Sequence, residues 1–115
     1  MAIQSGVDAE PQPADSQVRN YEVFNPDYSV GVACDCDGFV VGLHLDDEVW
    51  ENTDRWLAAE IVRVAKLAYL KARVGRRVEM ERRHGNTRFA DALNLPTEEQ
   101  YRRAEKVEFG VGGDR

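Results

Sequence analysis

The chain has 115 residues, of which 31% are charged and 43% hydrophobic, and its formal net charge is −6. This length accommodates one domain with one modest core. The acidic balance disfavours a general nucleic-acid binder, because phosphates require clustered positive charge. No apolar run approaches the roughly 20 residues of a membrane-spanning helix, and the N-terminus lacks the pattern of a signal peptide. We therefore expect a cytoplasmic protein without membrane insertion, and leave open whether it is also secreted.

The two ends of the chain differ in composition from its middle. Residues 1–20 contain Pro11, Pro13 and small polar residues with few apolar ones. Such a segment cannot bury enough surface to offset its conformational entropy, so a disordered tail is predicted. Glycines in residues 109–115 predict a second flexible tail. A single α+β domain is then expected over residues 21–108.

Three short segments with alternating apolar residues begin this domain. They cover residues 21–25, 28–34 and 39–45, and the period of two predicts half-buried strands. The sequence Asn25-Pro26-Asp27 predicts the first turn, and Asp35-Cys36-Asp37-Gly38 predicts a hairpin connection. The result is a three-stranded antiparallel meander.

The second face of the hairpin carries small or apolar residues where a solvent-exposed face normally carries polar ones. These residues are Gly31, Ala33, Val40 and Gly42, so we expect something to cover that face. The opposite face is expected to face the core. Tyr28 shares it with Val30 and Val32, and Phe39 and Leu45 share it with Val41 and Leu43. The residues expected in the core or in a dimer interface are Val30, Val32, Val41, Leu43, Leu57, Ile61, Val64 and Ala68.

A long amphipathic helix follows the strands. Its apolar residues recur at spacings of three and four, and Asn52 or Thr53 is the expected N-cap. Gly75 costs about 1 kcal/mol relative to alanine in a helix interior and so predicts an end or a bend. Continuing apolar residues favour a helix that extends to about Arg83. Such a helix is longer than its own sheet, and its overhanging stripe is expected to need a partner.

Two shorter helical segments are predicted near the C-terminus. Residues 87–94 suggest one helical turn, which Leu95-Pro96 interrupts. Thr97 and Gln100 have the spacing of a capping box, so a short C-terminal helix begins there, with Tyr101 on its narrow apolar edge.

No catalytic, cofactor or metal motif is present. Cys34, Cys36 and His44 offer three ligands without a fourth, so the cysteines are interpreted as reduced thiols. The acidic residues between Asp46 and Asp54 lack a nearby nucleophile or glycine-rich loop, which leaves acid-base or magnesium chemistry as a minor alternative. We predict a protein that is not an enzyme and has no cofactor.

Basic residues are concentrated toward the end of the long helix, where Glu79 and Glu81 interrupt them. In an acidic chain this pattern favours either a plain helix-end surface or a docking site for an acidic partner over a phosphate site. For Leu95, completion of the domain's own core is the open alternative. The residues predicted to bind a partner are Trp50, Arg76, Arg77, Arg82, Arg83, Leu95 and Tyr101.

The order of these elements resembles a known family. It consists of Asn25-Pro26, a strand reading Val30-x-Val32, a turn at Asp37-Gly38, the helical pattern from Leu57 to Arg73, and Leu93-Asn94-Leu95-Pro96-Thr97. This pattern resembles the EspD/EspH group of mycobacterial type VII secretion-associated proteins. The hairpin and helix are also similar to the wider YbaB-like fold.

The resemblance implies an accessory protein that acts as a chaperone or adaptor. Its partner would be a secreted protein substrate or a component of the secretion system. YbaB-like chains are similar in forming dimers, and the overhanging helix and uncharged hairpin predict a homodimer independently. The alternative is a YbaB-like nucleoid-associated DNA-binding protein. Binding of nucleic acid is disfavoured by the acidity and by the lack of a long helix before the first strand.

Overall fold

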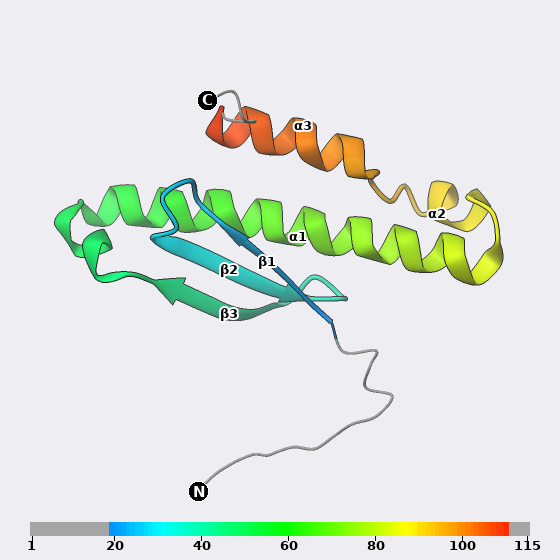
Figure 1. The fold of residues 1–115 in the computed structure, drawn as a ribbon, viewed down its shortest axis with the longest axis horizontal. Coiled ribbons are helices and arrows are strands. Elements are labelled where there is room, and N and C mark those ends of the chain that lie inside the picture. Colours follow the sequence, from blue (N-terminus) through cyan, green and yellow to red (C-terminus); the bar gives the residue numbers. More distant parts are fainter. Residues whose placement is uncertain (1–18, 111–115) are drawn as a thin grey trace, which may run out of the picture.

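The computed structural model describes residues 19–110, so the predictions for 1–18 and 111–115 lie outside the described part. Its three antiparallel strands, long helix and short C-terminal helix confirm the predicted α+β class. Figure 1 shows the arrangement, with the sheet below the long helix and the C-terminal helix running back above it. The elements are β1 (Asn20–Phe24), β2 (Val30–Asp35), β3 (Val40–Leu45), the 3-10 helix η2 (Asp47–Glu51), α1 (Asp54–His84), α2 (Arg88–Ala92) and α3 (Glu98–Phe109).

The sheet has the order β1-β2-β3, and one face of it packs against α1. Alternate residues of β2 point toward the helix, and Val30, Val32 and Cys34 are at most 1% exposed. They meet Val64 and Ala68 of α1, which are fully buried. The core therefore lies between the central strand and one stripe of the helix, as the alternating and helical patterns predict.

A buried polar cluster ties the first turn to α1. The Asn25 amide donates to Ser29 Oγ at 3.1 Å and to Glu60 Oε2 at 2.9 Å, while its carbonyl oxygen accepts from Val30 N at 3.0 Å. All three residues are at most 7% exposed, so these bonds satisfy groups that would be costly to bury alone. Tyr28 has a φ of 65° and lies in this turn, outside the strand predicted for it.

The β2–β3 hairpin confirms the predicted turn and corrects the predicted strand faces. Asp35 Oδ1 accepts from two backbone N–H groups of the turn, and Gly38 has a φ of 90°. A bulge near Ala33 shifts the register so that Val40 lies opposite Cys34. Phe39 and Val41 therefore do not continue the alternation of Leu43 and Leu45, because the bulge inserts an extra residue.

The helix α1 begins and ends close to its predicted bounds. Thr53 is the N-cap, and its side chain accepts a hydrogen bond from Trp56 N at 3.0 Å. The C-cap is Gly85, with a left-handed φ of 73°. At about 1.5 Å per residue its 31 residues span roughly 46 Å, against roughly 20 Å for a six-residue strand. The predicted overhang of the helix beyond its sheet is visible in Figure 1.

The glycine inside α1 neither ends nor breaks the helix. Gly75 lies against the phenol ring of Tyr21 in β1, and a Cβ at this position would lie 2.6 Å from Cε1 of that ring. With the Tyr21 ring in this position only glycine fits, and a larger residue would force the ring to move. The residue therefore serves packing between the helix and the sheet edge, although the sequence pattern alone predicted an end or a bend.

The C-terminal helix α3 confirms the predicted capping box, since Gln100 N donates to Thr97 Oγ1 and Thr97 N donates to Gln100 Oε1. It packs against α1 on the β1 side of the molecule, and Glu108 lies 3.5 Å from Lys66 Nζ at its far end. The 3-10 helix η2 occupies an acidic segment for which no helix was predicted.

We predict that Gly75→Ala destabilises the protein by about 1–3 kcal/mol, because the added methyl collides with the Tyr21 ring. In a Tyr21→Ala background the same change should instead stabilise by up to about 1 kcal/mol, as expected for alanine in a helix. Urea unfolding of the four proteins of this double-mutant cycle measures both values. Stabilisation by Gly75→Ala in the otherwise unchanged protein would contradict the packing role.

Candidate functional site

One side of the sheet is left uncovered by the helix. The helix α1 packs mainly against β1 and β2 and covers little of β3, of which Leu45 is partly buried against the core. As a result Val40, Val41 and Leu43 are 53–59% exposed, and Phe39 beside them is 69% exposed. The prediction that Val41 and Leu43 belong to the core is wrong for the isolated chain, whereas the other part of that prediction, a dimer interface, remains open.

The outer edge of β3 carries unpaired backbone groups. Asp46 N donates to Ser29 O, and in an antiparallel ladder this pairing places the N–H and C=O groups of His44 and Gly42 toward β2. Those of Leu43 and Leu45 consequently point outward. No residue of β3 is Asp, Glu, Lys, Arg or Pro, the residues that proteins commonly use to protect such edges.

The opposite edge of the sheet is protected. In β1 the outward backbone groups include those of Glu22, and Lys71 Nζ of α1 donates to Glu22 O at 3.0 Å. The helix α3 also lies along this side, where β1, Lys71 and Tyr101 line a groove of about 500 Å³. The two edges differ in kind, and β3 is the edge open for pairing.

A row of apolar residues on α1 flanks the open strand. Leu57, Ile61, Ala65 and Tyr69 recur every four residues and are only partly buried or exposed. The end of the row lies against the β2–β3 turn, since a Cβ at Gly38 would lie 2.7 Å from the Tyr69 ring. The row therefore runs along the β3 side of the helix. We call this surface the β3–α1 face, and its members are Val40, Leu43, Leu57, Ile61, Ala65 and Tyr69.

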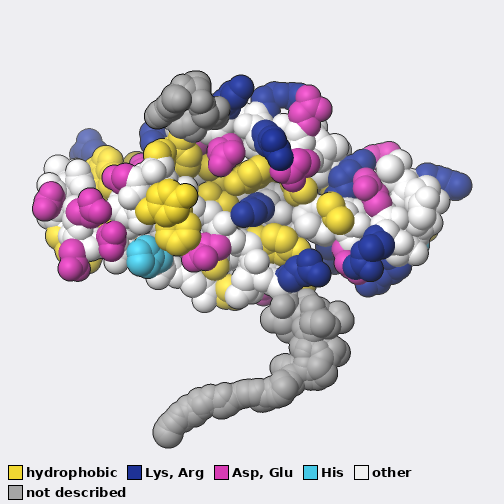
Figure 2. Space-filling view, in the orientation of Figure 1, with side chains coloured by type: hydrophobic (Ala, Val, Ile, Leu, Met, Phe, Trp, Pro, Cys, Tyr) yellow, Lys and Arg dark blue, Asp and Glu magenta, His cyan; other side chains and the backbone are white. Residues whose placement is uncertain are grey.

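Charge is distributed unevenly along the molecule. Acidic side chains gather at the end where α1 begins, and basic side chains are more frequent toward its other end (Figure 2). Trp50 is 66% exposed at the acidic end, so it remains available as a partner-binding residue. The acidic residues here are Asp46, Asp47, Glu48, Glu51 and Asp54.

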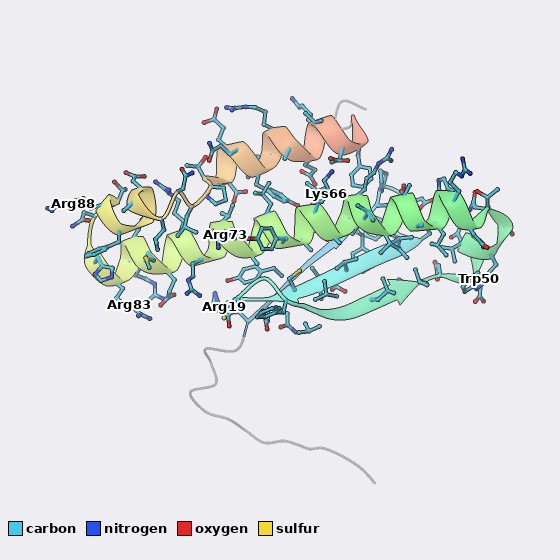
Figure 3. The ribbon with its side chains drawn as sticks, turned by 180° about the vertical axis from the view of Figure 1, so that it is seen from behind. Arg19, Trp50, Lys66, Arg73, Arg83 and Arg88 are labelled. Atoms are coloured by element: carbon cyan, nitrogen blue, oxygen red, sulfur yellow. The ribbon has the colours of Figure 1, made fainter. Side chains whose placement is uncertain are left out.

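The basic end contains a cavity of about 490 Å³ beneath the overhanging part of α1. Arg19 and Arg83 lie on the same side of the helix there, Arg19 where β1 begins (Figure 3). Three of the four arginines predicted to bind a partner contribute to this cavity. Its lining consists of Arg19, Tyr21, Cys36, Gly75, Arg76, Glu79, Met80, Arg82, Arg83 and His84.

Arg77, the fourth predicted arginine, points away from the cavity and joins α1 to the segment before α3. Its guanidinium donates to Leu95 O at 2.6 Å and to Asp91 Oδ1 at 2.5 Å, and Glu81 Oε2 lies 2.9 Å from its Nε. The hydrogen bond between Arg77 and Asp91 lowers the pKa of the Asp91 carboxyl and raises the pKa of Arg77. The Arg77 side chain is 13% exposed, so its hydrogen-bonding groups are used within the fold.

Leu95 and Tyr101 are only 4% and 9% exposed and so complete the chain's own core, which was the alternative left open for Leu95. Burial raises the pKa of Tyr101 to about 12, with smaller contributions from Glu105 and Glu98. These residues anchor α3 on α1 and are not exposed to a partner.

In residues 19–110 no group of three or more His, Cys, Asp or Glu side chains is arranged to hold a metal ion. Cys34 is buried, which raises the pKa of its thiol, and Cys36 is exposed and unpaired. None of the described helices is long and apolar enough to cross a membrane.

Comparisons with known proteins add no relative. No protein-family model, curated protein or solved structure matches the chain.

Several residues of the two surfaces were not predicted from the sequence. Arg19 and Cys36 belong to separate segments, and only folding brings them to the basic end of α1. Tyr69 follows the four-residue spacing of Leu57 and Ile61, so the helical pattern contained its signal.

We predict that the stability of the protein falls as the pH rises from about 10 to about 12. The phenol of Tyr101 has a folded-state pKa of about 12, above its ordinary value, so the fold favours the protonated form. The stability that the protonated phenol contributes is fully present below the unfolded-state pKa and is lost as the pH rises through the folded-state pKa. Urea midpoints measured from pH 9 to 12 should fall less steeply for Tyr101→Phe than for the unchanged protein. Equal slopes would contradict a buried phenol.

Proposed function

We propose that this protein is a non-enzymatic adaptor or chaperone that binds other polypeptides and that it works as a homodimer. The observation that carries the proposal is the β3–α1 face, which combines an unprotected strand edge with an apolar helix row. Surfaces of this composition pair with other polypeptides, because they offer backbone hydrogen bonds and apolar burial together.

The proposed occupant of the β3–α1 face is a second copy of the chain. Antiparallel pairing of β3 with its own copy is self-complementary, since the outward groups of Leu43 would meet those of the partner's Leu43. The result is a six-stranded sheet with both α1 helices on one face. Leu43 and Ile61 would then be covered by their symmetry mates.

The charge distribution supports this antiparallel arrangement. The two α1 helices would run in opposite directions, so the acidic end of one copy would lie beside the basic half of the other. In this arrangement Asp54 and Glu51 of one copy would lie at about the same height along the helix pair as Arg73 and Arg76 of the other copy. Such complementarity favours encounter and fixes orientation, although it adds less affinity than apolar burial.

The secretion context rests on the family resemblance, which supports an accessory role in type VII secretion for a protein of the cytoplasm. The competing proposal, binding of DNA, has one favourable observation in the basic end. Against it, Glu79 lies beside both Arg82 and Arg83, and Asp37 lies 3.2 Å from Arg76, which lowers the positive charge available to phosphates.

We predict that the unchanged protein has the mass of a dimer at micromolar concentration and that Leu43→Lys has the mass of a monomer. The lysine would place like charges opposite each other at the centre of the strand pairing. Light scattering coupled to size-exclusion chromatography measures both masses. Because Leu43 is 54% exposed in the single chain, its replacement should change the free energy of unfolding of the monomer itself by only about 0.5 kcal/mol.

The matched control for this experiment is Val107→Lys, which adds the same charge to an apolar residue of α3 that is 78% exposed. It should remain a dimer. A monomer mass for the unchanged protein across the accessible concentrations would refute the dimer, as would equal loss of the dimer in both variants.

We further predict that the tagged protein recovers specific partner polypeptides from the cytosol of its own cells. Recovery should survive nuclease treatment and should fall in a monomeric Leu43→Lys form, because a dimer presents two binding sites and gains avidity. Quantitative mass spectrometry of the recovered proteins provides the comparison. Recovery of nucleic acid alone, with protein signals that disappear after nuclease, would instead favour the DNA-binding proposal.

A further inference from the structure

We infer that the cavity at the basic end of α1 binds a short acidic segment of the partner polypeptide, with one or two carboxylates next to an apolar side chain. This inference rests on the proposed adaptor function and specifies the chemistry of its ligand. The cavity encloses about 490 Å³, a size that accommodates a few side chains.

The first argument is the excess of positive charge inside the cavity. Four arginines line it, and Glu79 is the single carboxylate among its lining residues. Glu79 is shared between Arg82 and Arg83, while Asp37 approaches Arg76 from the hairpin turn. No ion pair is formed by Arg19 within the described residues. The four arginines still outnumber these two carboxylates, so this end of a chain of net charge −6 retains an excess of positive charge that attracts further carboxylates.

The second argument is the geometry of the arginine groups. They come from two elements, because Arg19 precedes β1 while Arg76, Arg82 and Arg83 belong to α1. Figure 3 shows Arg19 and Arg83 on the same side of the helix. A guanidinium can bind a carboxylate through two parallel hydrogen bonds, which gives both affinity and orientation. Two carboxylates of one segment could thus be held at two sides of the cavity.

The third argument is the apolar part of the lining. The phenol ring of Tyr21 lies on Gly75, and Met80 and Cys36 complete this wall. An apolar side chain beside the carboxylates would bury itself there. A duplex nucleic acid offers no such group, and its regular phosphate charge would also meet the negative field of the rest of the molecule.

Cys36 provides a built-in reporter of binding. Its thiol is exposed and lines the cavity, whereas Cys34 is fully buried. Alkylation of the folded protein by iodoacetamide should therefore modify Cys36 alone. A ligand in the cavity should slow this reaction in a saturable manner.

The test uses the peptide acetyl-Gly-Glu-Leu-Glu-Gly-amide as probe and the full chain as target. We expect saturable protection of Cys36, and at least about tenfold weaker protection by the same peptide with glutamine in place of both glutamates. Protection should also weaken at least about tenfold in the double variant Arg82→Gln, Arg83→Gln. Raising the ionic strength should weaken binding further.

The matched control is the double variant Arg102→Gln, Arg103→Gln. These arginines are also adjacent and also pair with glutamates on their own helix, but they lie on α3 away from the cavity. This variant should retain full protection. Equal loss in the two double variants would reduce the effect to general electrostatic attraction and overturn the site.

Three further outcomes would overturn the inference. They are equal binding of the glutamine peptide, protection by inorganic phosphate at lower concentration than by the peptide, and no protection by any of the probes. The mass of the dimer and the recovery of partners are measured independently of Cys36. Failure of the cavity alone would therefore leave the adaptor proposal standing, whereas failure of partner recovery would remove both.

Discussion

The structure depends on one constraint, which is that a single long helix packs on two strands of a three-stranded sheet. The buried faces of β1 and β2 match the stripe of α1 that contains Val64 and Ala68. Among the helices of residues 19–110 the next longest, α3, packs on α1 at the β1 side and does not extend the cover toward β3. Val40, Val41 and Leu43 of β3 therefore remain exposed, and the adjacent row of α1 is only partly covered. Both proposed interactions follow from this mismatch between helix and sheet.

The length of α1 has a second consequence at its C-terminal end. Where the sheet has ended, the face of the helix that would otherwise continue the core carries Glu79, Arg82 and Arg83. A stripe that is apolar over the sheet thus becomes basic beyond it. The expectation of an overhanging stripe was correct, but its chemistry differs from the apolar surface that was expected. An apolar face toward β3 and a charged cavity below the overhang can serve different occupants.

Local patterns were sufficient to predict most of the elements. The capping box at Thr97, the end of α1 near His84 and the hairpin turn at Asp35–Gly38 depend on neighbouring residues, so their signals are contained in short stretches. Long-range contacts explain what was missed. Gly75 is compatible with a helix because Tyr21, more than fifty residues earlier, packs on it.

The site was less predictable than the fold for the same reason. Burial of Leu95 and Tyr101 and the internal hydrogen bonds of Arg77 depend on how α3 returns along α1. The periodicity of a helix does not distinguish an arginine that faces solvent from one that donates hydrogen bonds to a neighbouring segment. The bulge near Ala33 likewise changes which residues of β3 face the helix, and strict alternation does not reveal it.

The central claim is that the free edge of β3 is paired in solution, and hydrogen exchange of individual backbone amides tests it most directly. The amides of Gly42 and His44 face β2 and should be protected at every concentration. Those of Leu43 and Leu45 face outward, and we expect their protection at high protein concentration to be lost on dilution. Fast exchange of Leu43 and Leu45 at every concentration, with Gly42 and His44 still protected, would contradict the account.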